Sequence, residues 1–158
     1  MLLKMTILSF LGSVFPLILF NIDRKKIIWT GIGGALGWIA YSITLDYSGS
    51  TVIGSFFGAF AVNIYSEIMA RIKKTPASMF YVPGIFPLVP GITAYSTINY
   101  IVEGKFNEAL GKAAFTLAIG GAIAFGIMLS STIVKFITQL HKRYAKIQQP
   151  LQQKNTSE

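Results

Sequence analysis

The sequence predicts an all-α integral membrane protein, a bundle of about five transmembrane helices of which the fourth is interrupted by proline and glycine. Hydrophobic residues fill 53% of the 158 positions and charged residues only 13%, about half the charged share of an ordinary soluble domain. The apolar residues gather in runs that approach the roughly 20 residues a helix needs to cross a bilayer. None of these runs alternates between apolar and polar residues as barrel strands do.

The first two spans are predicted over residues 2–20 and 27–45. Residues 2–20 are apolar apart from Lys4 and small polar residues, and a basic cluster at residues 23–26 follows. A signal peptide would have a shorter apolar region and a small-residue cleavage site, so this segment is expected to be a span. Residues 27–45 carry no charge and include Trp29 and Trp38, which suit a membrane interface.

The remaining spans are predicted over residues 51–66, 76–102 and 113–134. A short glycine-containing turn precedes the third span, and a balanced polar loop at residues 103–112 precedes the fifth. The fourth is long enough to be tilted or interrupted. Residues 1–140 would therefore form the bundle, and the basic, glutamine-rich tail at residues 141–158 is expected to be disordered.

The distribution of basic residues predicts the orientation. Loops after the first, third and fifth spans hold several cations, whereas the loop after the second has none. Basic loops stay on the cytoplasmic side, so the chain is expected to be a multi-pass plasma-membrane protein with a cytoplasmic C-terminus. Lys4 and the lysines of the fourth loop disagree mildly, and a four-span version, in which residues 2–20 or 76–102 do not fully cross, stays open.

Composition argues against several function classes. The chain has no cysteine, and its one histidine, His141, lies in the basic tail. Thiol catalysis, disulfides and thiolate metal sites are excluded, so the sequence predicts no enzyme, no metal site and no cofactor. The net charge is +8, but the cations lie between apolar runs and no nucleic-acid reader motif is present. The expected surroundings are the lipid bilayer.

The most informative segment reads VPGIFPLVPGITAY at residues 82–95. It holds Pro83, Gly84, Pro87, Pro90 and Gly91. Proline removes a helical donor and clashes one turn back, at about 3 kcal/mol in a helix interior, so three prolines in eight residues are expected to break the helix. Broken backbone inside a membrane needs protein or a water-filled cavity around it, and secondary transporters place substrate there. A simple kink or re-entrant loop without substrate is the alternative.

Polar side chains without charge follow this break. They include Thr93, Tyr95 and Asn99, which could bind a small polar solute or bond to neighbouring helices. If a helix begins near residues 90–92, its free amides and positive dipole end would suit a carboxylate on an anionic solute.

Two polar residues of the third span are candidates for coupling or gating. A proton-coupled carrier needs a carboxylate that titrates inside the membrane protein, and Glu67 lies one turn from Asn63 and one turn from Arg71. The plainer interpretation, an interfacial ion pair set by helix spacing, is preferred for Glu67 at this point.

Small residues recur at close spacing in several spans. The second span contains TGIGGALG at residues 30–37, the third has Gly54 and Gly58, and the fifth has Gly120, Gly121 and Gly126. Such patterns let helices approach closely. Packing within the bundle is the preferred interpretation, with a subunit contact or sliding surface as the alternative.

The string FPLVPGITAY from Phe86 to Tyr95 resembles the C-terminal half of the threonine/serine exporter family. The likeness extends over residues 6–140 in layout, but only this string is specific. In that family some members are long fused chains and others are split, and this chain resembles the short subunit of a split exporter. The positions carried over are Pro87, Pro90, Gly91 and Tyr95, with a structural role in forming the pathway.

The resemblance implies a function and a partner. The function would be export of a threonine- or serine-like amino acid, or of a dicarboxylate such as succinate, driven by the proton gradient. A longer complementary subunit, encoded separately, would supply the other half of the pathway, and a homo-oligomer is a further option. The alternative from another class is a non-transporting membrane scaffold or assembly subunit.

Overall fold

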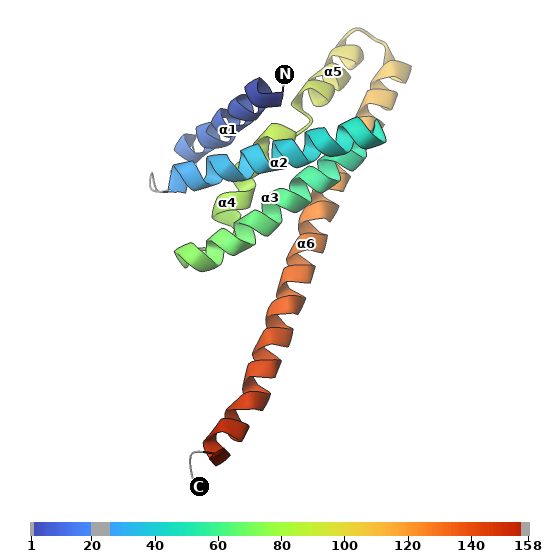
Figure 1. The fold of residues 1–158 in the computed structure, drawn as a ribbon. Coiled ribbons are helices and arrows are strands. Elements are labelled where there is room, and N and C mark those ends of the chain that lie inside the picture. Colours follow the sequence, from blue (N-terminus) through green and yellow to red (C-terminus); the bar gives the residue numbers. More distant parts are fainter. Residues whose placement is uncertain (1, 20–25, 156–158) are drawn as a thin grey trace.

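The computed structural model describes residues 2–19 and 26–155, with side chains over residues 3–16 and 26–140, and every regular element in this part is a helix. In chain order these are α1 (Leu2–Leu19), α2 (Ile27–Ser48), α3 (Thr51–Lys73), α4 (Ser78–Gly84), the 3-10 helix η2 (Phe86–Leu88), α5 (Gly91–Val102) and α6 (Phe106–Asn155). Figure 1 shows α1, α2 and α3 side by side, and α6 leaving the bundle toward the C-terminus. The predicted all-α membrane bundle is confirmed.

Glycines set the close packing of the first three helices. On α2, Gly34 lies against the Ser13 hydroxyl of α1, and Gly37 lies against Val62 and the backbone oxygen of Gly58 on α3. A β-carbon at either glycine would overlap its neighbour. Close backbone approach through small residues is how membrane helices gain packing without a hydrophobic driving force. The TGIGGALG segment is therefore a packing face within the bundle.

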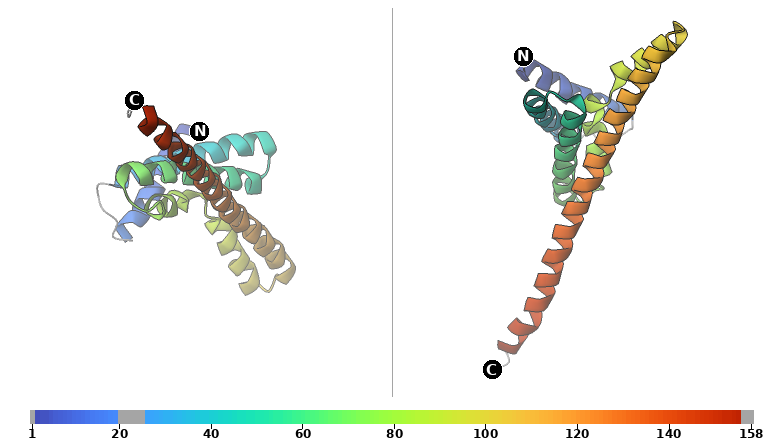
Figure 2. Two further views of the ribbon diagram at one scale, coloured as in Figure 1. Left: turned by 90° about the horizontal axis from the view of Figure 1, so that it is seen from below. Right: turned by 90° about the vertical axis from the view of Figure 1, so that its right-hand side faces the viewer.

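Helices α3 and α6 run parallel, because successive residues of α3 contact successive residues of α6. Gly126 of α6 lies against the backbone oxygen of Phe56, and Arg71 near the end of α3 reaches Thr138 of α6. Gly120 and Gly121, by contrast, have no neighbouring atom within 4 Å of an added β-carbon, so the expected packing role holds in this chain for Gly126 alone of the three. Figure 2 shows α6 extending far beyond the other helices at its C-terminal end, with α5 lying beside its beginning.

The predicted interruption of the fourth apolar segment is confirmed. Helix α4 ends at Gly84, η2 follows, and α5 continues after a bend of 55°. The bend lies at Val89, whose backbone is extended (φ −63°, ψ 129°), because the residue before a proline is driven out of the helical region. Pro83 differs from the expectation, since it is accommodated inside α4, one residue before that helix ends.

Within the described residues, three helices are long and apolar enough to cross a membrane: α2, α3 and the part of α6 from Phe106 to Leu140. The bent pair makes a fourth if it forms one span. The described part of the first segment, Leu3–Pro16, is a shorter apolar helix. Residue 20 and most of the following basic cluster lie outside the described residues. A fifth span through α1 stays a prediction.

Helix α6 begins earlier than the sequence predicts. The sequence predicts a polar loop over residues 103–112, but the helix starts at Phe106. Its first turn contains Glu108, where a carboxylate stabilises the positive helix end. Gly104, with φ 74°, forms the shortened turn. At the other end the α6 backbone is helical through Asn155. The expected disorder of residues 141–158 stays a prediction.

We expect Gly37→Ala to destabilise the bundle by about 1–3 kcal/mol, the usual range for adding volume to a packed core. The added methyl group would overlap Val62. The free energy of unfolding in lipid or detergent measures the effect. Gly120→Ala is the matched control, because its methyl group meets open space and because alanine is more favourable than glycine inside a helix. Equal stability of the two variants would contradict the packing role of Gly37.

Candidate functional site

A cavity of about 320 Å³ lies beside the break, at the end of the bundle where α2 turns into α3. Its volume falls within the usual range of small-molecule sites. Its walls come from α2, α3, the break with the first turn of α5, and α6. The lining residues are Trp38, Tyr41, Thr51, Ser55, Pro87, Leu88, Val89, Pro90, Gly91, Ile92, Thr93, Phe115 and Ile119. The lining carries no charged side chain, so any solute there is held by hydroxyls, amides and apolar contacts.

The positive end of α5 opens on this cavity. Helix α5 starts at Gly91, with Pro90 as its N-cap residue, which agrees with the helix start expected near residues 90–92. The Gly91 amide donates to the Val89 carbonyl at 2.8 Å, while the amides of Ile92 and Thr93 belong to the first turn, whose donors have no partner within a helix. Both residues line the cavity. This end of α5 can therefore donate hydrogen bonds to a carboxylate or carbonyl oxygen.

The structure brings together four of the predicted pathway residues. Pro87, Pro90, Gly91 and Thr93 all line the cavity. The Thr93 hydroxyl donates to the Pro90 carbonyl at 3.0 Å, and its oxygen can still accept a hydrogen bond.

The other four predicted residues lie elsewhere. Pro83 and Gly84 are buried in α4, and an added β-carbon at Gly84 would meet Val62 at 2.8 Å. Tyr95 is 71% exposed on α5 and is absent from the cavity lining. The Asn99 amide donates to a carboxylate oxygen of Glu103 at 2.8 Å. These residues therefore pack the bundle or face outward.

The turn after α5 contains a local ion pair. Lys105 Nζ lies 2.7 Å from Glu103 Oε2. The hydrogen bond from Lys105, followed by its charge, holds the pKa of the exposed Glu103 carboxyl below its ordinary value. Asn99 thus belongs to the polar end of the α5–α6 hairpin rather than to the cavity.

Several lining residues were not identified as site residues from the sequence. Trp38, which the sequence predicts to lie at a membrane interface, lines the cavity together with Tyr41, and the centroids of their rings are 5.1 Å apart. The Trp38 Nε1 atom is buried without a hydrogen-bond partner, a feature with no signal in the sequence. Phe115 and Ile119 of α6 join the lining only because α6 crosses beside the break.

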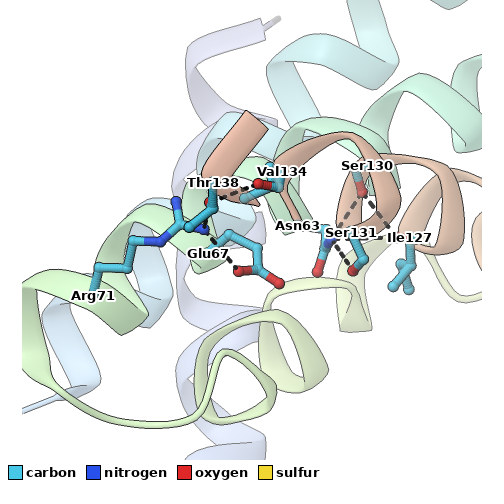
Figure 3. Close-up of polar contacts among 8 residues, drawn as sticks. All are labelled: Asn63, Glu67, Arg71, Ile127, Ser130, Ser131, Val134 and Thr138. Carbon is cyan, nitrogen blue, oxygen red and sulfur yellow. Dashed lines mark hydrogen bonds and ion pairs between the residues drawn. The ribbon is translucent and has the colours of Figure 1, made fainter. Parts of the chain in front are cut away.

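A second polar cluster lies between α3 and α6 (Figure 3). Asn63 is fully buried, and its Nδ2 atom lies 3.2 Å from the Ile127 carbonyl oxygen and 2.8 Å from the hydroxyl oxygens of both Ser130 and Ser131. The sequence identified Asn63 but not its serine partners. These contacts fix the register of α3 against α6.

One turn further along α3, Glu67 and Arg71 continue this cluster. Arg71 Nη2 lies 3.8 Å from Glu67 Oε2 and donates to Thr138 Oγ1 of α6 at 2.9 Å. Their side chains are 19% and 51% exposed, so the pair lies at the edge of the bundle. Within the described part of the chain, no group of three or more His, Cys, Asp or Glu residues is placed to hold a metal ion.

The fold and the cavity define a multi-pass helical membrane protein with a ligand-sized cavity at a broken helix. A family model described as "Threonine/Serine exporter, ThrE" matches residues 5–133, and the chain belongs to this family. This confirms the resemblance drawn from the proline-glycine string.

A curated relative and the solved structures give less detail. A protein of Haemophilus influenzae described as uncharacterized is 24% identical over 120 residues, which make up 71% of this chain and 40% of the relative. This chain therefore spans about two fifths of the relative's length. No solved structure matches the chain.

Proposed function

We propose that this chain is a subunit of a secondary transporter that exports a small polar metabolite, either a threonine- or serine-like amino acid or a dicarboxylate such as succinate. The observation that carries the proposal is the helix break at Val89 and Pro90 beside an uncharged cavity of about 320 Å³. Transporters of several folds bind substrate at discontinuous helices whose free ends point at the solute. Family membership supports the same class of function.

The chemistry of the cavity suits a carboxylate-bearing solute. The first-turn amides of Ile92 and Thr93 and the positive end of α5 would bind the carboxylate, which amino acids and dicarboxylates share. Thr51, Ser55 and Tyr41 line the same space, and their hydroxyl groups would bond to a second polar group of the solute. Because no cation lines the cavity, binding would be weak enough for release, as an exporter requires.

A longer partner subunit is part of the proposal. Alternating access needs two halves that move against each other, and the Haemophilus influenzae relative is long enough to carry more than this chain in one polypeptide. In this proposal the two subunits together carry the solute, and the proton gradient across the plasma membrane drives export.

In the orientation predicted from the basic loops, the cavity lies toward the outer side, because it adjoins the cation-free turn between α2 and α3.

The proposal is tested by efflux of labelled serine, threonine and succinate from cells that express this chain with a longer family member, and from cells that express each chain alone. We expect one solute to leave faster only when both chains are present. Membrane abundance of each chain is the control. Full export by the longer chain alone, with this chain inserted at normal abundance, would favour the scaffold alternative.

The helix break is tested by changing Pro87 and Pro90 together to alanine. Each proline opposes a continuous helix by about 3 kcal/mol, so the double variant should straighten the segment and lower the efflux rate by roughly tenfold or more. The matched control is Pro76→Ala, since Pro76 is exposed between α3 and α4. Unchanged efflux of the double variant at normal membrane abundance would contradict the proposal that the helix break forms part of the transport pathway.

A further inference from the structure

We propose that Glu67 is the proton-binding residue of this transporter and that it alternates between two partners on its own helix. When ionised, its carboxylate pairs with Arg71; when protonated, its hydroxyl donates a hydrogen bond to the amide oxygen of Asn63. The inference rests on the proposed function as a proton-coupled exporter. It assigns a site to the coupling that the cavity itself, which has no ionisable lining residue apart from Tyr41, does not provide.

The orientation of the Asn63 amide is fixed by its surroundings. Nδ2 lies 3.2 Å from the Ile127 carbonyl oxygen, and a carbonyl oxygen only accepts hydrogen bonds. The nitrogen must therefore face α6, and the reversed amide would place two acceptors against each other. The two protons of this nitrogen already have three acceptors within reach, from Ile127, Ser130 and Ser131.

The other end of the same amide is left without a partner. Asn63 is 0% exposed, and its Oδ1 atom is buried with no hydrogen-bond donor. Buried acceptors without a partner are rare, because each one has lost its hydrogen bonds to water without a replacement. An acceptor kept free at a buried position is suited to a donor that is present only part of the time.

Glu67 is the ionisable side chain placed to be that donor. It follows Asn63 by one helical turn, and side chains at this spacing are neighbours. Helical side chains lean toward the N-terminus of the helix, so the Glu67 carboxyl leans toward the turn of Asn63. In Figure 3 the carboxyl lies between Arg71 and Asn63, with one oxygen toward each residue. The oxygen toward Arg71 is Oε2, at 3.8 Å.

Within the elements that pack against α3, helix α4 and η2 carry no charged residue, and the one charged residue of α2, Asp46, lies at the opposite end of the bundle. On α6, Lys135 is exposed and forms no ion pair with Glu67, whereas the side chain of His141 lies outside the described residues.

Two other described cations at this end of the bundle contact other groups. Lys73 Nζ lies 4.6 Å from the centroid of the Trp29 ring, and Lys26, the N-cap residue of α2, donates to Met79 Sδ at 3.5 Å. Arg71 is therefore the described charge that ion-pairs with the carboxylate.

The cycle moves one proton. A proton from water binds the Glu67 carboxylate, an O–H bond forms, and the Arg71 ion pair is lost as the carboxyl turns to Asn63. Release of the proton to water on the other side restores the ion pair. Because Arg71 also binds Thr138 and Asn63 also binds Ser130, each state changes the contacts that join α3 to α6. Protonation would thereby bias the packing of the two helices.

The test is an infrared pH titration of the purified full chain in lipid vesicles, followed at the C=O stretch of protonated carboxylic acids. It needs no transport, so its failure and a failure of the export proposal are separate results. We expect a band in the wild-type chain that is missing in Glu67→Gln. In Asn63→Leu, the pH at which this band is half formed should fall by about one unit, because the protonated form loses its acceptor.

The sign of this shift separates the proposal from simple burial. A more apolar environment without an acceptor would raise the half-formation pH, so an unchanged or raised value in folded Asn63→Leu overturns the inference. Arg71→Gln gives a second measurement that does not depend on the buried site. Here the half-formation pH should rise by about half a unit, as expected for a half-exposed pair, and Arg71→Lys should retain the wild-type value. No shift in Arg71→Gln, or no band lost in Glu67→Gln, would also overturn it.

Discussion

The arrangement of this protein depends on one constraint, that a backbone amide or carbonyl inside a membrane protein must have a partner. Pro90 has no amide to donate, and it forces Val89 into an extended conformation. The helix therefore stops and restarts, and the restart leaves free donors at the beginning of α5. They are tolerated where they line a cavity, so the break and the cavity have the same origin.

The wall behind the break is closely packed for a different reason. Glycines of α2 allow α1 and α3 to approach at backbone distance, and Asn63 bonds α3 to α6. Leu88 of η2 packs against Gly58 of this wall. The short helix η2 is thus held by packing that a continuous helix, lacking the bend, would not reach. Close packing and broken backbone are complementary features of the same bundle.

Much of the fold could be predicted from the sequence, because lipid demands long apolar helices and proline interrupts them. The interrupted segment and the start of α5 near Gly91 follow from local chemistry. The sequence does not predict that α6 begins as early as Phe106. The charges of Glu108 and Lys112 suggest a loop, although Glu and Lys are both good helix formers. Tyr95 is the last residue of the specific string FPLVPGITAY, yet it faces outward. No local pattern places Trp38 or Ile119 in the cavity. The composition of the candidate site is a tertiary property, set by the 55° bend and by the crossing of α6.

The most direct test of the central claim is the backbone conformation of residues 84–95 of the full chain in lipid bilayers, read from the carbon chemical shifts of a solid-state NMR spectrum. We expect extended shifts at Val89, between helical shifts at Phe80 in α4 and at Ala94 in α5. Helical shifts without interruption through Val89 and Pro90 would contradict it, because a continuous helix would leave no free first turn and no cause for the cavity.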